Sequence, residues 1–347
     1  MKVGRGAYIA LAGGLAALCG LLGLALMVSM LRSPRGGSAA PSRNLGATLA
    51  AATPMEIAPA TSPQPAGDLT EPTGKIVFTC QVFRVQARNQ ICISNPDGTG
   101  FRRITSDNSR QHHYPSLSPD GEQVVYAAFL EANVYEIYEY DLAAGVARRL
   151  TDHLGVLGAP EISPDGRSIV FTRWTPASEK HTLWMMDRDG TNLREFLNPE
   201  KGEAWDPTWS PVGDEVLLAS DMGGSAQLWI TPLGGGQSRS ITALPALRGR
   251  SDWSTLDQIV TYSGPAWERE LFIMGADGSG VHQVGPTGGN SQGPSFSPDG
   301  KWITFTAYFD SPGDIHGCEI YLMRADGTDL RRLTENDYCD YQPRWGP

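Results

Sequence analysis

The stretch Tyr114-Pro-Ser-Leu-Ser-Pro-Asp-Gly, which ends at residue 121, decides the fold because the chain repeats it. Close copies begin at Ala159, Asp206 and Gly293, a degenerate copy stands at Ser251-Asp-Trp-Ser, and a truncated copy begins at Gln342. In each copy an apolar residue ends a short strand, Ser-Pro prevents that strand from continuing, and Asp-Gly supplies the positive φ angles of a tight hairpin turn. A recurring unit of 43 to 49 residues predicts a repeat architecture.

Each copy is followed by sequence typical of three more strands. An apolar or alternating segment such as 123–127 comes next, and a segment such as 136–140 follows it. A second Asp-Gly turn usually leads into the fourth strand, which carries Arg-Arg-Ile-Thr at 102–105 or Arg-Arg-Leu-Thr at 148–151 and 331–334. Four strands in a unit of this length predict a β-propeller blade.

The count of strands predicts how the ring closes. Residues 75–105 supply the second, third and fourth strands of a first blade but no first strand, whereas residues 342–345 form a first strand without a blade. We therefore expect an all-β, six-bladed β-propeller of four-stranded blades over residues 74–347, in which a C-terminal strand completes blade one.

The repeated turns also carry a resemblance to a known family. The Ser-Pro-Asp-Gly and Asp-x-Asp-Gly turns with Arg-Arg-Leu-Thr resemble the repeats of TolB-type (WD40-like) β-propellers, and similar propellers occur in tricorn and prolyl-oligopeptidase-like proteases. The resemblance covers about 270 residues and implies the fold. It leaves the ligand and any role in the Tol-Pal system open, because function depends on sites grafted onto a fold.

The N-terminal part of the chain predicts a membrane anchor. Residues 7–31 contain no charge, and about 20 apolar residues are enough for a helix to cross a bilayer. The apolar region of a cleaved signal peptide would be shorter, about 7 to 15 residues. We expect a short cytoplasmic segment at 1–6, a single-pass transmembrane signal-anchor at 7–31, a disordered Pro/Ala/Ser/Thr-rich tether at 32–73, and a propeller outside the cytoplasm.

Charge and motif content exclude several classes of function. Residues 74–347 hold 23 Lys and Arg against 35 Asp and Glu, so the propeller is a poor match for nucleic acid. No phosphate-binding loop, Cys-x-x-Cys or His-Glu-x-x-His occurs. The Gly-x-Ser-x-Gly pattern at 289–293 precedes an expected strand instead of a helix, so it does not fit a nucleophile elbow. We expect a monomer that is not an enzyme and needs no cofactor.

One face of the propeller is the expected binding face. Loops that join a fourth strand to the next first strand, and loops that join second to third strands, open on the same face of the disc. Aromatic side chains among polar groups suit a protein, peptide or glycan interface. The candidate binding residues are His112, His113, Tyr114, His153, Trp174, His181, Trp205, Asp206, Trp267, His316, Asp340 and Tyr341.

The histidines and cysteines leave alternatives open. We expect His112, His113 and His153 in loops that join a fourth strand to the next first strand. Together with His181 they could hold a divalent ion as neutral imidazoles, as in a metal-dependent polysaccharide lyase or hydrolase with its site in the channel mouth. Cys80, Cys92, Cys318 and Cys339 allow three disulfide pairings, of which we favour Cys80 with Cys92 and Cys318 with Cys339. Four free buried thiols are the alternative.

These features favour a membrane-anchored scaffold that binds an envelope protein, peptide or glycan at its loop-rich face. The metal-dependent enzyme is the first alternative. A sensor domain is the second, and it would have to signal through a partner, because only about six residues precede the expected span.

Overall fold

The computed structural model of the chain describes residues 70–82, 88–107, 109–315 and 317–347. The expected cytoplasmic segment, the expected span and the expected tether up to residue 69 lie outside the described residues. Within the described part of the chain, no helix has the length and apolar character needed to cross a bilayer.

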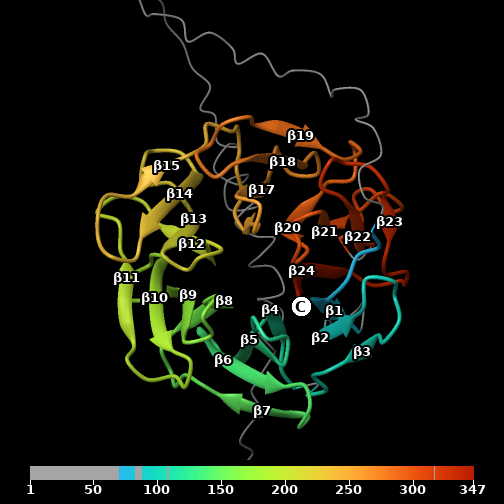
Figure 1. Cartoon of the computed structure of the whole chain (residues 1–347). Coiled ribbons are helices and arrows are strands. Elements are labelled where there is room, and N and C mark those ends of the chain that lie inside the picture. The colour runs from blue at the N-terminus through green and yellow to red at the C-terminus, as the bar shows by residue number, and fades with distance from the viewer. Residues whose placement is uncertain (1–69, 83–87, 108, 316) are drawn as a thin grey trace, which may run out of the picture. The chain divides into compact units, whose positions relative to one another are not determined.

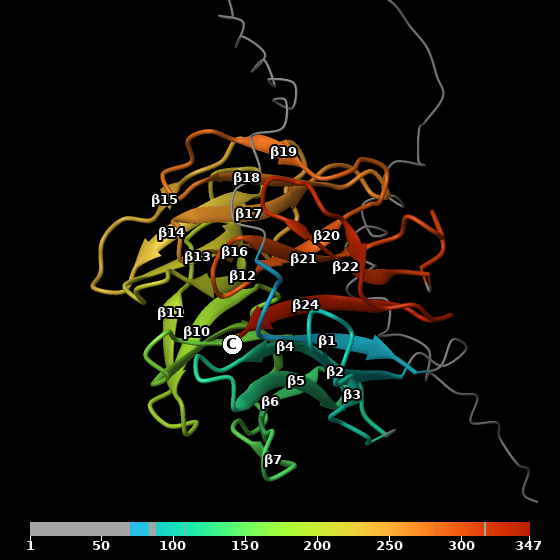
Figure 2. The same ribbon diagram turned by 45° about the vertical axis from the view of Figure 1, so that its right-hand side comes forward.

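The described strands form six four-stranded antiparallel sheets arranged around a central axis (Figures 1 and 2). Blade one contains β24 (Asp340–Gly346), β1 (Lys75–Gln81), β2 (Asn89–Ser94) and β3 (Arg102–Arg103). Blade two contains β4 (His112–Leu117), β5 (Gln123–Glu131), β6 (Val134–Asp141) and β7 (Val146–Arg149). Blade three contains β8 (Val156–Ile162), β9 (Ser168–Trp174), β10 (Thr182–Asp187) and β11 (Arg194–Leu197).

The other three blades follow in chain order. Blade four contains β12 (Ala204–Trp209), β13 (Glu215–Ser220), β14 (Gln227–Pro232) and β15 (Arg239–Ser240). Blade five contains β16 (Asp252–Trp253), β17 (Gln258–Ser263), β18 (Glu270–Gly275) and β19 (His282–Val284). Blade six contains β20 (Gln292–Phe296), β21 (Trp302–Ala307), β22 (Glu319–Arg324) and β23 (Arg331–Arg332).

The C-terminal strand closes the ring, as the sequence predicts. Strand β24 pairs antiparallel with β1, in a register that places Gly346 opposite Lys75 and Asp340 opposite Cys80. The first strand of the chain therefore lies second in its blade. Both ends of the closing pair, Gly74 and Pro347, consequently lie on the face that carries the hairpin turns, where the Lys75 ammonium group donates to the Gly121 carbonyl.

Two disulfides lie beside this closure. Cys80 is bonded to Cys92 between β1 and β2, and Cys318 is bonded to Cys339, which directly precedes β24. The Cα atoms of the two pairs are 5.8 and 4.5 Å apart. These are the two pairings favoured from the sequence.

The Ser-Pro-Asp-Gly turn is built on its serine. The Ser118 hydroxyl donates to the Asp120 carboxylate and accepts the Gln123 amide at 2.9 Å, while the Gly121 amide donates to the Ser118 carbonyl. Positive φ falls on the glycine, at 67°, and the aspartate acts through its carboxylate instead. The degenerate copy in blade five keeps the turn, because the Ser254 hydroxyl accepts the Gln258 amide.

The threonine of Arg-Arg-Leu-Thr fastens the fourth strand to the third. In blade two, the Thr151 hydroxyl accepts the Ile137 amide at 2.9 Å and donates to Glu136, which also accepts the His153 amide. Thr334, Glu319 and the Asn336 amide repeat this arrangement in blade six. Blade four repeats it with a neutral side chain, since Gln227 accepts the Thr242 hydroxyl and the Leu244 amide.

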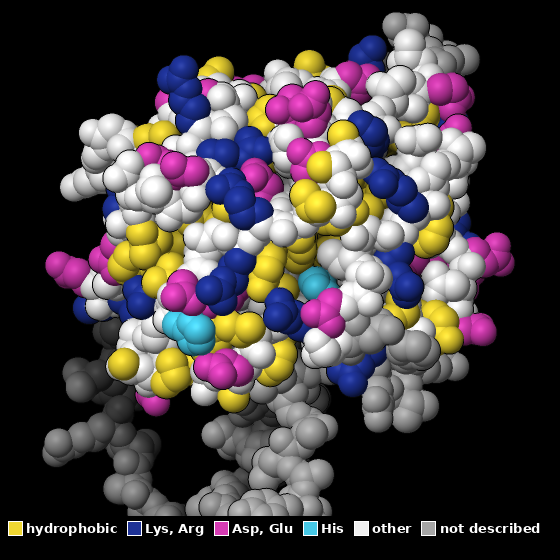
Figure 3. Space-filling view, turned by 90° about the horizontal axis from the view of Figure 1, so that it is seen from below, with side chains coloured by type: hydrophobic (Ala, Val, Ile, Leu, Met, Phe, Trp, Pro, Cys, Tyr) yellow, Lys and Arg dark blue, Asp and Glu magenta, His cyan; other side chains and the backbone are white. Residues whose placement is uncertain are grey.

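The apolar core of the described residues consists of six clusters, one at each contact between neighbouring blades. Between blades one and two, for example, Val77 and Ile91 pack against Leu117 and Val124. The outer rim is charged, and Figure 3 shows basic and acidic side chains interspersed on the edge seen from below. On β7, Arg148 pairs with Glu139, and Arg149 pairs with Asp152.

Loss of either disulfide should destabilise the ring without unfolding it. The bridges close loops of 12 and 21 residues, for which chain entropy gives about 3 kcal/mol each. We expect Cys318→Ala with Cys339→Ala, and separately Cys80→Ala with Cys92→Ala, to lower the free energy of unfolding by about that amount, measured with urea. An unchanged urea midpoint in both double variants would contradict a stabilising role.

Candidate functional site: the channel and the loop-rich face

The innermost strands of five blades have a bulge that turns one residue out of the ladder, and Arg250, which precedes β16, occupies the equivalent position in blade five. Each bulge residue has positive φ, and a proline follows it in five of the six blades, where it cannot donate to the ladder. The bulge residues are Tyr114, Ala159, Asp206, Arg250, Gly293 and Gln342. In blade five Ser251 replaces the proline, and β16 is only two residues long.

Two residues further along each innermost strand lies a ring of polar side chains. Its members are Ser116, Glu161, Thr208, Asp252, Ser295 and Arg344. Arg344 forms an ion pair with Glu161 at 2.5 Å, and Thr208 donates to the same carboxylate at 2.6 Å. Ser295 donates to Asp252 at 2.8 Å, and Asp252 lies 3.9 Å from Arg344. These contacts link blades one, three, four, five and six at the axis.

Two arginines span the channel. The Arg250 guanidinium donates to the Pro115 carbonyl of blade two at 3.0 Å and lies over the Tyr114 ring, with its carbon 5.2 Å from the ring centre. Arg344 donates to the Ser251 and Pro294 carbonyls of blades five and six. The exposed fractions of Arg250 and Arg344 are 3% and 4%. Side chains therefore fill the middle of the channel, around which the blades stand in Figure 1.

Burial controls the ionisation of this cluster. Burial raises the pKa of the Glu161 and Asp206 carboxyls and lowers the pKa of Arg250 to about 10. Burial alone would lower the pKa of Arg344 too, but Glu161 and Asp252 raise it above its ordinary value. The opposite charges of Arg344 and Glu161 thus counteract the effect of burial on each other's pKa.

Sequence reasoning missed this polar ring, although the repeat contains its signal. The third residue of the motif is polar in all six copies, whereas the fourth is always a large apolar residue, as in Thr208-Trp209 and Arg344-Trp345. A polar position fixed beside a core position in every repeat indicates a common polar environment, which in a propeller is the axis.

The structure places the predicted histidines apart. His112 and His113 belong to β4 and not to the preceding loop, so their expected loop position is wrong. His112 is buried against Tyr126, and burial lowers its pKa to about 4. Burial likewise lowers the pKa of His113 to about 3, and its ring nitrogen lies 3.3 Å from the Tyr341 hydroxyl.

The other two candidate ligands are paired with carboxylates. His181 contacts Glu203, and His153 lies 2.8 Å from Asp152, whose carboxylate raises the pKa of the imidazole. Within the described ranges, only Glu136, Asp152 and His153 bring three ligand atoms within 4.8 Å of one another. The Glu136 carboxylate already accepts the Thr151 hydroxyl and the His153 amide, and in blade four the neutral Gln227 takes the same place beside Thr242. The position of Glu136 in this cluster is therefore explained by the contact between the third and fourth strands and does not require a metal ion.

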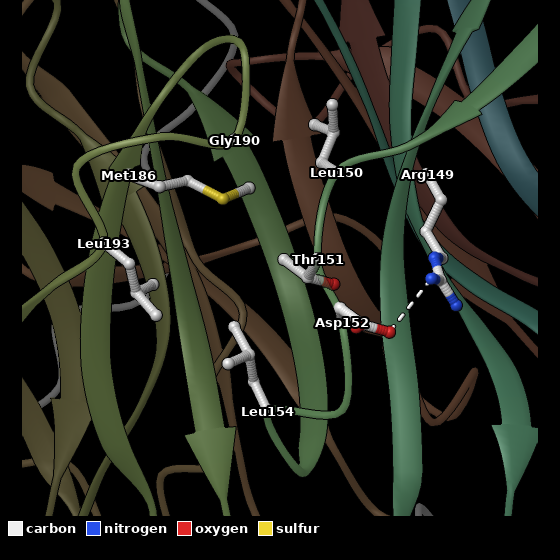
Figure 4. A pocket seen from close by; sticks show the side chains of 8 residues that line it. All are labelled: Arg149, Leu150, Thr151, Asp152, Leu154, Met186, Gly190 and Leu193. Carbon is white, nitrogen blue, oxygen red and sulfur yellow. Dashed lines mark hydrogen bonds and ion pairs between the residues drawn. The ribbon is translucent and has the colours of Figure 1, made fainter.

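Two surface hollows lie beside the Thr151–Glu136 and Thr334–Glu319 contacts. One, of about 390 Å³, lies beside Arg149, Thr151 and Asp152 and is closed on its other side by Leu154, Met186, Gly190 and Leu193 (Figure 4). A second, of about 530 Å³, lies in blade six beside Glu319, Arg332 and Tyr338. The first hollow extends along the outer edge between blades two and three, where Gly190 and Leu193 of the turn between β10 and β11 line it, and the second lies among the loops of the loop-rich face.

The predicted tryptophans differ in what they expose. Trp205 donates its indole N–H to the Arg248 carbonyl at 3.1 Å and packs against the core, and Trp174 is half-buried at the end of β9. Trp267 is 43% exposed, has a φ of 69°, and lies edge-on to Tyr308 with ring centres 5.3 Å apart. Of these three indoles, Trp267 is the one placed to meet a partner without refolding.

The remaining predicted residues lie at the channel or beside the pairing of β24 with β1. Tyr114 and Asp206 are bulge residues, and the Asp206 carboxylate accepts the Arg250 amide at 3.1 Å. Asp340 is buried beside the Cys318–Cys339 disulfide and accepts the Asn336 side-chain amide. Tyr341 reaches His113, and His316 lies outside the described residues.

Comparison with known proteins assigns the family. The model of the TolB beta propeller domain matches residues 70–266, more than half of the 347 residues. The chain belongs to the TolB β-propeller family. The resemblance of the turn sequences to this family is therefore confirmed.

Relatives with known names share only part of their length with this family member. The Tol-Pal system protein TolB of Francisella tularensis is 26% identical over 98 residues, which is 28% of this chain and 22% of that protein. The chain also spans no more than 41% of two further curated relatives.

Solved structures resemble the fold. TolB from Acinetobacter baumannii has a TM-score of 0.68 at 24% identity, over 79% of this chain and 67% of that one. Puromycin hydrolase has a TM-score of 0.51 at 17% identity, over 71% of this chain and 42% of that one. These similarities show the fold alone.

Removing Arg344 should destabilise the propeller more than removing a surface arginine. Arg344→Met leaves the buried Glu161 carboxylate unpaired and should cost about 3 to 5 kcal/mol of unfolding free energy in urea. Arg344→Met with Glu161→Gln should recover at least half of the loss, since the neutral amide keeps an acceptor for Thr208. Arg332→Met, which removes a surface ion pair with Asp310, should cost less than about 1 kcal/mol. Equal losses in both single variants would contradict the proposed role of the ring.

The pairing of β24 with β1, which closes the ring, should lose stability as the pH rises towards neutrality. Burial, together with Glu319, raises the pKa of Asp340 to about 7 from 3.8. The proton is therefore bound more tightly in the folded state, and the stabilisation that is fully present below pH 4 declines as the pH rises from about 4 to about 7. We expect Asp340→Asn to be closer to the wild type in urea midpoint at pH 5 than at pH 8, where the variant should be the more stable. A constant difference between the two pH values would refute the shift.

Proposed function

We propose that this protein is a membrane-anchored, extracytoplasmic scaffold that binds a partner protein or peptide, or a glycan, at its loop-rich face without catalysing a reaction. The anchor is residues 7–31 and the tether is residues 32–73. The fold of the TolB family supports a binding role in the cell envelope, because propellers of this class present loops from several blades on one flat face.

The observation that carries this proposal is the direction in which the chain enters the ring. Thr73 accepts the Trp345 indole N–H, and Lys75 lies opposite Gly346, so the N-terminal segment joins the propeller on the turn face. A tether attached there leaves the loop-rich face free on the opposite side of the disc. The filled channel separates the two faces, so a ligand would bind to the loop-rich surface and would not pass through the axis.

The composition of the loop-rich face supports a macromolecular partner. Trp267 offers an exposed aromatic surface, and Tyr308 supports it from blade six. The hollow of this face in blade six is open, which suits a broad contact better than an enclosed small molecule. An envelope protein or peptide is the partner we favour.

Photo-crosslinking tests which face binds. A benzoylphenylalanine at Trp267 reports on the loop-rich face, and one at Val212 reports on the turn face, where the wild-type side chain is 80% exposed. In the native membrane, the full-length chain should give a discrete adduct from position 267 and none from position 212. Adducts from position 212 alone, or from neither position, would overturn the proposed binding face.

A further inference from the structure

We infer that residues 54–59 of the tether dock on an apolar sector of the turn face, and that this docking shortens the free tether and holds the turn face towards the membrane. The apolar sector consists of Val212 and Leu233 of blade four and Leu256 of blade five. The inference goes beyond the proposed function, because it concerns the opposite face of the disc and requires no partner at the loop-rich face.

The apolar sector occurs where two neighbouring blades lack the aspartate of the repeat. In blades two, three and six the third residue of the Ser-Pro-Asp-Gly turn is an aspartate that accepts the hydroxyl of the turn's serine. Val212 and Leu256 stand at this position in blades four and five, with exposed fractions of 80% and 56%. In blade four the Ser210 hydroxyl donates to Asp214 instead, at 2.9 Å. Val212 is therefore not needed to hold its turn, and it is exposed to solvent.

Hydrogen bonds on the turn side join blades four and five at this sector. The Leu233 amide donates to the Asp214 carbonyl at 2.9 Å, so the two turns of blade four lie side by side. Arg239 of blade four donates to the Ala276 carbonyl of blade five at 3.4 Å. The Ala276 amide donates at 3.1 Å to the carbonyl of the residue that follows Leu256. Single exposed apolar residues are ordinary on a protein surface, but three in adjoining turns form a patch that suits an apolar partner.

The described residues that precede β1 lead towards this sector. The Trp345 indole N–H of blade one donates to the Thr73 carbonyl at 2.8 Å. Two residues earlier, Glu71 pairs at 2.6 Å with Arg331, which follows the outer turn of blade six. In Figure 1 this blue segment accordingly runs from β1 towards β23. Blades five and four come next around the ring, so the chain ahead of residue 70 starts on the side of the disc where the apolar sector lies.

The tether is long enough to reach the sector. Residues 58–69, which are twelve residues, separate the docking segment from the described part of the chain. Fully extended, they span at most about 40 Å. Packed sheets lie about 10 Å apart, so blade four lies about 20 Å from blade six. The docking segment can therefore cross blade five without strain.

The sequence of the docking segment suits an extended apolar contact. Pro54 and Pro59 flank it, and a proline biases the residue before it towards extended backbone. Successive side chains of an extended segment point to opposite sides, so Met55 and Ile57 point to the same side. Residues 58–68 contain no large apolar side chain that would compete. A short linker gives an effective concentration of millimolar order, so even a weak contact stays occupied.

The charge of the turn face favours the tether over a lipid surface. The aspartates of blades two, three and six lie on the same face as the apolar sector. These carboxylates repel the anionic surface of a bilayer. The docking segment, in contrast, carries a single charge, at Glu56, which an extended backbone directs away from the side of Met55 and Ile57.

Limited proteolysis of the full-length chain in detergent tests the docking. Glutamyl endopeptidase cleaves after Glu56, inside the docking segment, and mass spectrometry follows the rate. Val212→Asp with Leu256→Asp restores the residue type of the other blades. This double variant should raise the cleavage rate about three- to tenfold, because cleavage follows the population of undocked tether. Val212→Ser with Leu256→Ser should raise it as well, without adding charge.

Matched controls separate docking from general effects. Val146→Asp with Leu193→Asp removes exposed apolar side chains from blades two and three and should leave the cleavage rate unchanged. Tryptic cleavage after Arg43 reports access to the tether outside the docking segment, and it should be equal in all variants. Thermal melting shows that each variant is folded.

Photo-crosslinking identifies what occupies the sector. A benzoylphenylalanine at Val212 should form a link to residues 54–59 of the same chain, mapped by mass spectrometry of the digested protein. Such a link leaves the mass of the chain unchanged, which distinguishes it from the adduct of a partner. Met55→Ser with Ile57→Ser should reduce the yield of this link severalfold.

Two outcomes would overturn the inference. One is an equal rate of cleavage after Glu56 in the wild type and in both double variants of Val212 and Leu256. The other is a link from position 212 to lipid or to a second copy of the chain in place of the tether. The adduct at position 267 is measured separately, so the proposed binding face stands or falls without this result.

Discussion

The rest of the structure depends on the pairing of β24 with β1. This contact joins the two ends of the domain, and it turns six sheets that would otherwise form an open arc into a ring in which each blade packs against two neighbours. The same strand carries Arg344 into the channel, where it contacts blades three, five and six. One segment of seven residues therefore closes the ring and supplies one of the two arginines that fill its axis. Because blade one is assembled from both ends of the domain, its stability requires the whole ring, and this explains why both disulfides lie beside it.

The fold could be predicted almost completely, because its signals are local and repeated. The Ser-Pro-Asp-Gly turns fix where strands begin and end, and six copies average out the weakness of any one of them. Even the degenerate copy at Ser254 keeps the hydrogen bond that the serine makes in the others. The sequence placed His112 and His113 in a loop, and they lie instead at the start of β4, because the bulge at Tyr114 allows the strand to pair on both of its sides.

The candidate site was less predictable, because its contacts join residues far apart in the chain. Arg250 lies 135 residues from Pro115, and Arg344 pairs with Glu161 from another blade. Their meeting at the axis follows only from the closed ring and from the inward turn of each bulge. The histidines, by contrast, were chosen by residue type alone. In the structure His153 pairs with Asp152 and His181 pairs with Glu203, in different parts of the ring. A residue type that can bind a metal does not indicate a metal site unless the fold brings several such residues together.

The two faces of the disc are under different constraints. On the turn face, the aspartates bond to their own turns, as Asp120 does with Ser118, so these charges are used locally to hold hairpins together. On the loop-rich face, connections between blades are longer, and the irregular blade five replaces a regular innermost strand with the segment that carries Arg248 and Arg250. Arg250 is held across the channel by the Pro115 carbonyl and the Tyr114 ring. The departure of blade five from the repeat thus places an arginine in the channel, and departures from a repeat are tolerated where they add a contact that the regular blades cannot provide.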